Sequence, residues 1–414
     1  MVTKYDIFEI VYKNNEFIKP IEVVERLKKN KSEYKNIYRI LNDLEKNKFL
    51  VKSEGGFQVY VSDKTRSLYE LIDYCVHNNI NYNLLLDENL VIFINEVLKK
   101  KEFQQKDMKI DPKTFKKYIE ILNRFGLLLI ISKKPFKAMM FYNTLINNIL
   151  VYFGYKYSPL RKFDINYLDE IEKELILFRR SRKKNEMGYK KIVNEFETSF
   201  IQHSLSLEGN PITLPDTIKI LRDEVIPRDL KSEDVDEIKN YQKAILKMLK
   251  DASQKRPLTK EAILEYHKLA MQHKPDLAGK IRKKLVHIKG NPDFKIASVS
   301  EIEPRLNNLL ERYNDFVKKK KTPLKEIIDF SAYFHNEFQH IHPFEDGNSR
   351  TTRLITFHLL HLKDIPILDI PFGLLDEYLG YTKGSRERED KNLFQTLQRI
   401  ILFNLKKINE RLNA

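Results

Sequence analysis

The amino-acid sequence predicts a mainly α-helical protein with one or two small α+β modules at its N-terminus. Two observations support this prediction. Between residues 195 and 405, apolar residues recur at three- and four-residue steps, which is the spacing of one helix face. Before residue 145, helical stretches are followed by short apolar runs around Gly55-Gly56 and around 132–135, a pattern typical of β-hairpins. At 414 residues, the chain is long enough for two or three domains.

The composition indicates a globular protein, with 42% apolar and 32% charged residues. No apolar run is long enough to span a membrane, and the first residues do not resemble a signal peptide. Cys75 is the single cysteine, so a disulfide framework is excluded. We therefore expect a cytoplasmic protein without membrane association. The net charge is +16, and residues 101–140 hold 10 basic and 4 acidic residues, so nucleic acid is a candidate partner of that segment.

Residues 1–66 show the order helix, helix, helix, hairpin. The expected helices are 5–13, 20–27 and a third that Ser32 caps and that continues to Lys46, with short strands near Leu50 and Phe57. This order resembles a winged helix-turn-helix, with residues 31–46 as the recognition-like helix. DNA is therefore a candidate partner of this module.

Residues 85–145 repeat this order, because a helix over 90–100 is followed by one that Asp111-Pro112 opens and by strands at 127–131 and 136–141. Residues 40–42 and 121–123, both Ile-Leu-Asn, then occupy equivalent places. Two interpretations stay open for this half: tandem winged-helix modules that bind DNA, or a helical protein-docking domain with two hairpins. Residues 160–195 are expected to form a helical linker, whose basic run at 179–184 is a solvated helix end.

The stretch 335–353 predicts a helix, a tight polar loop and a second helix. An apolar stripe runs through Phe334, Phe338 and Ile341 and stops at Pro343, and the helical period resumes at Leu354. Glycine in such a loop lets an anion approach the free N–H groups of the following helix. The loop therefore predicts a phosphate site.

The charged side chains of this loop suggest phosphoryl-type transfer from a nucleotide to a hydroxyl. Arg350 and Arg353 share a helix face and could clamp a polyphosphate. Asp346 offers an oxygen ligand that suits Mg²⁺. His342 titrates near neutrality and could accept the hydroxyl proton.

Residues 342–353, His-Pro-Phe-Glu-Asp-Gly-Asn-Ser-Arg-Thr-Thr-Arg, resemble the signature loop of the Fic family, His-x-Phe-x-(Asp/Glu)-Gly-Asn-Gly-Arg-x-x-Arg. Ser349 departs from it by replacing the second glycine. A backbone N–H remains there, so the pocket can form provided that this position does not need a positive φ. The resemblance extends over residues 195–408 and implies an all-helical Fic domain with a β-hairpin flap.

The resemblance implies a protein adenylyltransferase that moves AMP from ATP, with Mg²⁺ or Mn²⁺, onto a Ser, Thr or Tyr hydroxyl of a protein, including its own. His342 would be the base and Asp346 the metal ligand. The phosphate pocket and the nucleotide contacts would come from six residues: Gly347, Asn348, Ser349, Arg350, Arg353 and, by a looser match to an adenine-site segment, Tyr378.

Two further segments resemble parts of the family. Ser204, Glu208 and Gly209 fit the inhibitory motif (Ser/Thr)-x-x-x-Glu-(Gly/Asn), and their place before the loop implies a class II member in which Glu208 neutralises Arg353. Gly209 is also a good helix C-terminus, and the two interpretations are compatible. Leu285 to Ile296 would form the flap, a β-hairpin to which an extended segment of the target protein adds.

Other readings stay open. The same site could remove AMP from a modified protein or transfer another nucleotide moiety. Alternatively, the chain could be a winged-helix DNA-binding regulator with a weakened Fic module, as Ser349 allows. Zinc binding by His335, His340 and His342 is disfavoured, because no cysteine or acidic partner has ligand spacing. A homodimer is left open.

Overall fold

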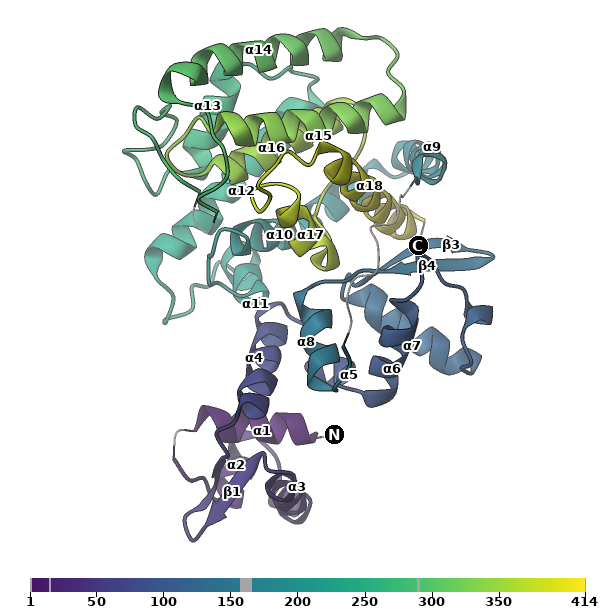
Figure 1. Cartoon of the computed structure of the whole chain (residues 1–414), viewed down its shortest axis with the longest axis vertical. Coiled ribbons are helices and arrows are strands. Elements are labelled where there is room, and N and C mark those ends of the chain that lie inside the picture. The colour runs from purple at the N-terminus through teal and green to yellow at the C-terminus, as the bar shows by residue number, and fades with distance from the viewer. Residues whose placement is uncertain (1, 15, 157–165, 289–290, 414) are drawn as a thin grey trace. The chain divides into compact units, whose positions relative to one another are not determined.

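The computed structural model describes residues 2–14, 16–156, 166–288 and 291–413. The chain divides into two compact units, which Figure 1 shows together. The first comprises Met1–Lys99 with Thr144–Leu160, and the second comprises Lys100–Asn143 with Arg161–Ala414. Helices dominate both, and the sheets of the described residues are two antiparallel hairpins. The predicted mainly α fold class is confirmed. No helix of the described residues is long and apolar enough to cross a membrane.

The first unit begins with the predicted order of helices and a hairpin. A Thr3 capping box starts the first helix, and an antiparallel bridge joins Ile18 to Phe57 of the hairpin. Ser32 lies inside a 3₁₀ turn, Lys31–Glu33, and does not cap the third helix, whose N-cap is Glu33, one residue later than predicted. The elements of this unit are α1 (Lys4–Lys13), α2 (Pro20–Arg26), α3 (Tyr34–Lys46), β1 (Leu50–Ser53), β2 (Gly56–Val59), α4 (Asp63–His77), α5 (Tyr82–Leu85), α6 (Glu88–Val97) and α8 (Thr144–Tyr152).

A second group with the same order follows, and its hydrogen bonds repeat those of the first. Phe103 bridges Ala138, as Ile18 bridges Phe57. The Leu127 N–H donates to the Leu122 carbonyl and its own carbonyl accepts from Phe141, as Phe49 does with Leu44 and Tyr60. The second hairpin and the helix before it are α7 (Pro112–Arg124), β3 (Leu128–Lys133) and β4 (Phe136–Met140).

Two details of the predicted repeat are corrected by the structure. α3 and α7 have equal length and end at Lys46 and Arg124, so residues 121–123 correspond to 43–45 and not to 40–42. The predicted alignment of the two helices was therefore shifted by about one helical turn. Apolar residues recur every three or four positions, so the sequence pattern looks similar after such a shift. Residues 85–145 are also divided between the units: α6 packs on α8 in the first, whereas α7 packs on β3 in the second.

The second unit is built around the antiparallel helices on either side of the predicted loop. α15 packs against α14, α16 and α18, and α16 also packs against α12 and α13 (Figure 1). The remaining elements are α9 (Leu168–Lys184), α10 (Glu186–Ser206), α11 (Leu214–Ile218), α12 (Ser232–Ser253), α13 (Lys260–Ala270), α14 (Val299–Lys318), α15 (Leu324–Ile341), α16 (Asn348–Leu362), α17 (Leu375–Gly380) and α18 (Asp390–Leu412).

Two segments differ from their predicted form. α9 was expected as part of a linker, but it packs along α18 and buries Ile171, Leu175 and Phe178, because its apolar face needs a partner. The segment predicted as the flap hairpin forms no strand in its described part and makes one antiparallel bridge, Ile288 to Asn291. Polar side chains hold it instead: the Asn291 amide donates to the carbonyls of Lys383 and Ser385, both at 3.0 Å.

Candidate active site

The predicted loop joins α15 to α16 through two left-handed backbone positions. His342 ends α15 with φ 48° and ψ 58°, and its N–H donates to the Phe338 carbonyl at 3.0 Å. Gly347 has φ 78° and directly precedes the first residue of α16. A Cβ at Gly347 would lie 2.8 Å from the Met271 sulfur, so glycine is required by both conformation and space. The free N–H groups of α16 begin at this point.

Asn348 fixes the shape of the loop from inside. Its side-chain oxygen accepts the Phe344 N–H at 2.9 Å, and its amide nitrogen donates to the Phe344 carbonyl at 2.8 Å. Asn348 is buried, so these hydrogen bonds are shielded from water. Ser349 lies in helical conformation within α16, so the condition for a serine at this position is met.

Two residues that the sequence analysis did not single out hold the loop from outside. His267 of α13 accepts the Gly279 N–H at Nδ1 (2.9 Å), so its Nε2 carries the proton and donates to the Asp346 carbonyl, also at 2.9 Å. Its ring stacks on Phe344 with centroids 3.7 Å apart. The buried Arg282 donates from Nε to the His342 carbonyl at 2.7 Å and from a terminal nitrogen to the Ala297 carbonyl.

The imidazole of His342 is in the neutral form that a general base needs. Its Nδ1 lies 3.2 Å from the Gln339 carbonyl, which can only accept, so Nδ1 donates and Nε2 has a free lone pair. Burial lowers the pKa of His342 to about 4, and the nearby Arg282 contributes to the lowering. The imidazole is therefore neutral at pH 7.

Asp346 is ionised and engaged by three donors. Its Oδ1 accepts the Gly347 N–H at 2.6 Å and an Arg350 N–H at 3.0 Å, and its Oδ2 accepts from Lys274 at 3.0 Å. Burial raises its pKa, but Arg350 and Lys274 lower it more, to about 2. The carboxylate keeps 40% of its surface exposed, so a ligand could reach it.

The two arginines of the loop have different partners. Arg350 is buried between carboxylates, because it also pairs with Glu237 of α12. Arg353, 1% exposed, donates from Nη2 to Glu208 Oε1 at 2.9 Å and from Nε to the Ser204 hydroxyl at 2.6 Å. The predicted contact between Glu208 and Arg353 is thus present, whereas Glu237 was not foreseen.

Glu208 is held by a second cation. Lys383, which follows α17, donates to Glu208 Oε2 at 2.8 Å and to the Leu207 carbonyl at 3.0 Å. Burial would raise the pKa of Glu208, but Arg353 and Lys383 lower it to about 2. The stability that these pairs provide is present above about pH 4.5 and is lost as the pH falls toward 2. Gly209 follows with φ 92°, as expected at a helix C-terminus.

Tyr378 of α17 lies in the interior and is 3% exposed. Its hydroxyl lies 2.5 Å from His335 Nε2 of α15. Burial raises the pKa of Tyr378, and the nearby Arg353 counteracts the rise. Tyr378 is therefore an interior residue that contacts His335 and lies near Arg353.

Several histidines are buried in the neutral form, so we expect the free energy of unfolding to fall in mild acid. Burial lowers the pKa of His335 to about 3 and those of His358 and His361 to about 4. Each binds a proton more readily in the unfolded chain, so the free energy of unfolding falls as the pH drops from 6.5 to 4, by up to about 4 kcal/mol per pH unit for these three groups; His267 and His342, whose pKa burial also lowers to about 4, add to the fall. His203, whose pKa the adjacent Asp369 raises against the effect of burial, acts in the opposite direction and offsets part of this.

Urea unfolding at pH 7.5 and pH 5 measures this effect. The His358→Phe variant should have the smaller difference between the two values, because it loses one of the titrating groups. An unfolding free energy that is equal at both pH values would contradict the prediction.

The site thus lies in a helical domain. Its central helices, α15 and α16, are joined by a glycine-containing loop, and the neutral His342 stands at the start of that loop. Comparison with known proteins agrees, because residues 257–360 match the Fic/DOC family. The chain therefore contains a Fic domain.

Proteins named protein adenylyltransferase Fic are similar in sequence. The one from Drosophila persimilis is 29% identical over 188 residues, covering 45% of this chain and 36% of the relative; for Drosophila grimshawi the values are 28%, 45% and 38%. The match thus spans little more than a third of these curated relatives. A Fic domain-containing signaling protein from Bacteroides thetaiotaomicron shares the fold, with a TM-score of 0.52, 21% identity, and coverage of 59% of this chain and 97% of that one.

Proposed function

We propose that this protein transfers AMP from ATP to a Ser, Thr or Tyr hydroxyl of a protein, including its own. The observation that supports this most strongly is the loop: a neutral histidine with a free Nε2 lone pair stands next to a rigid glycine-containing turn at a helix N-terminus. The matching relatives are named as adenylyltransferases, which agrees with this function.

In the proposed reaction, the target hydroxyl oxygen attacks the α-phosphorus of ATP. The bond from that phosphorus to the bridging oxygen breaks, pyrophosphate leaves with the electron pair, and His342 Nε2 takes the hydroxyl proton. The N–H groups that follow Gly347, including those of Asn348 and Ser349, would hold phosphate oxygens, and Arg353 would neutralise the developing charge. Arg350 keeps Asp346 oriented, since it binds that carboxylate directly.

The residues present also fit a divalent cation. Mg²⁺ prefers one or two carboxylates together with substrate phosphates, and Asp346 is an ionised, partly exposed carboxylate on the loop. A bound Mg²⁺ or Mn²⁺ would neutralise phosphate charge. Lys274 now occupies Asp346 Oδ2 and would have to give up that contact.

We further propose that the contacts of Glu208 keep the protein inhibited. Arg353 can hold a phosphate only if it is not already neutralised, and Glu208 now takes that place. The same site could instead favour AMP removal, in which case Glu208 would assist the reverse process. Incubation with ATP labelled at the α-phosphate tests transfer: label that becomes covalent supports it, and label that leaves a previously modified protein supports removal.

The target would dock along the segment Leu285 to Ile296, next to the loop. Arg282, which precedes this segment in the chain, donates to the His342 carbonyl. Asn291, within the segment, donates to the Lys383 carbonyl. Leu285 is 61% exposed and so is available for contact with another chain. These observations support a docking role for this segment, whose described residues form no helix or strand.

A second candidate function is DNA binding by the first unit, which the exposed face of α3 favours. Lys35 and Arg39 are exposed on this helix. Lys52 of β1 joins the same face, because its ammonium donates to the Tyr38 hydroxyl at 3.0 Å and to the Asn42 side chain at 3.2 Å. A helix with exposed basic and amide side chains next to a hairpin suits the major groove.

Titration of the full chain with duplex DNA at several salt concentrations tests this second function. The affinity for DNA falls as salt rises, so the slope of log K against log salt is negative. Replacing Lys35 and Arg39 with alanine should make this slope less negative by about two, because about one counterion fewer is released for each phosphate contact that is lost. The control changes Lys64 and Arg66 of α4 to alanine, for the same loss of charge. An absence of binding at low salt would leave protein docking as the role of this unit.

A further inference from the structure

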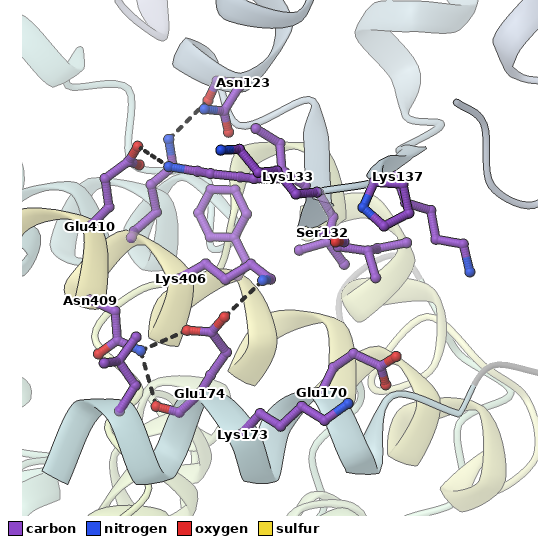
Figure 2. Close-up of a pocket in the computed structure, with 18 of the residues that line it drawn as sticks. Asn123, Ser132, Lys133, Lys137, Glu170, Lys173, Glu174, Lys406, Asn409 and Glu410 are labelled. Carbon is purple, nitrogen blue, oxygen red and sulfur yellow. Dashed lines mark hydrogen bonds and ion pairs between the residues drawn. The ribbon is translucent and has the colours of Figure 1, made fainter. Parts of the chain in front are cut away.

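A cleft outside the Fic loop lies between the β3–β4 hairpin and the helices α9 and α18, all within the second unit (Figure 2). Its volume is about 770 Å³, which is within the usual range for small-molecule sites. Its floor is apolar and includes Leu129, Ile131, Leu177 and Phe403. The cleft is thus large enough for a ligand the size of a nucleotide.

The rim of this cleft is strongly basic. Six lysines and three glutamates line it, which leaves a net charge of +3; the lysines are Lys133, Lys134, Lys137, Lys173, Lys406 and Lys407, and the glutamates are Glu170, Glu174 and Glu410. A concave surface with an excess of one charge concentrates ions of the opposite charge. The cleft therefore favours an anion.

Two of the three glutamates that line the cleft already accept hydrogen bonds from neighbouring side chains. Glu174 accepts from Lys406 at 2.9 Å and from the Asn409 amide at 2.7 Å, and Glu410 accepts from Lys133 at 3.1 Å (Figure 2). Lys137 pairs with Glu102 at 2.7 Å, so Lys134, Lys173 and Lys407 are the lysines of the cleft that make no ion pair with a described residue.

Among these lysines, Lys407 is held by a single long hydrogen bond to the described part of the chain. Its ammonium donates to the Asn123 carbonyl at a long 3.4 Å and makes no ion pair with any described residue. It also lies over the Phe403 ring, 5.6 Å from the centroid. Burial lowers its pKa; the charge of Glu410 raises it, and the charges of Arg411 and Lys133 lower it. Two neighbouring cations that line a cleft gain energy when an anion binds between them.

We propose that this cleft binds a nucleotide-sized anion that carries adjacent phosphates. Lys133 and Lys407 would hold one phosphate and Lys134 or Lys173 the next, while the apolar floor would accept the rest of the molecule. A duplex fits less well, because Glu170 and Glu174 face the same space and would repel a long phosphate backbone. This site is separate from the Fic loop and does not depend on the proposed transfer of AMP.

Hydrogen–deuterium exchange on the full chain tests the proposal with three probes: inorganic tripolyphosphate, ATP and a short DNA duplex. Either of the first two should protect residues 128–140 and 403–412. Protection by tripolyphosphate would show that the phosphate chain is sufficient, and protection by ATP alone would show that the base is needed. Any protection of residues 342–353 reports the Fic loop separately, so failure of one site does not imply failure of the other.

Two pairs of substitutions locate the binding. Lys133→Ala with Lys407→Ala should weaken the affinity for the protecting probe roughly tenfold or more. Lys134→Ala with Lys173→Ala should also weaken it, and both residues are exposed, so their loss leaves the packing unchanged. Lys183→Ala with Lys184→Ala, in the last turn of α9 and outside the cleft, is the control for net charge and should leave affinity unchanged. Absence of protection, equal weakening by the control, or protection by the duplex alone would overturn the proposal.

Discussion

His342→Ala is expected to abolish covalent transfer of AMP while leaving nucleotide binding nearly intact. The imidazole is the group with a free lone pair beside the loop, and a general base contributes about 10²- to 10⁴-fold to such a reaction. In the proposed reaction the phosphate contacts would come from the backbone after Gly347 and from Arg353, which the substitution does not change. Transfer is measured with α-labelled ATP and binding by calorimetry.

His340→Ala is the matched control. This histidine lies two residues earlier at the end of the same helix, but its Nδ1 faces the Lys295 carbonyl at 2.7 Å and not the loop. It should therefore transfer AMP at close to the wild-type rate. A His342→Ala protein that labels itself or a target as fast as the wild type would show that another group is the base.

Glu208→Gly should raise AMP transfer at least about tenfold, because it removes the carboxylate that now neutralises Arg353. Glu208→Gln, which keeps the shape and removes the charge, should give an intermediate rise. Self-labelling from α-labelled ATP is the measurement. If Glu208 also assists AMP removal, removal should fall in the same variants in which transfer rises.

Glu195→Gln serves as the control for Glu208, which lies just beyond the C-terminus of α10. Glu195 lies within that helix and pairs with Arg411 at 2.6 Å, away from the loop. Its substitution should not change transfer. A folded Glu208→Gly protein with unchanged or lower transfer would refute the inhibitory role.

The sequence was sufficient to predict those parts of the site that lie within short motifs. The loop 342–353 has its residues at fixed steps, and the contact of Glu208 with Arg353 followed from two motifs taken together. His267 and Arg282 were missed as contacts of the loop, and Lys383 was missed as a contact of Glu208, because they come from distant segments and lie in no local pattern.

The same reasoning explains the errors in the fold. The two N-terminal hairpins were predicted correctly, since turn residues and apolar runs are local signals. The division of residues 85–145 and the packing of α9 depend on which apolar faces meet, and periodicity does not identify the partner of a face. The flap was expected from family resemblance, and polar anchors hold that segment instead.

The place of Glu208 has a consequence for how this activity could evolve. The body of α10 belongs to the core through Phe200, Ile201 and Leu205, whereas Glu208 lies just beyond its last turn and is only partly covered. Under the proposed inhibitory role of Glu208, a change at one codon would adjust the resting level of activity without altering the apolar packing of α10. Such a substitution would also remove the ion pairs with Arg353 and Lys383, so the change in activity would be coupled to a loss of stability.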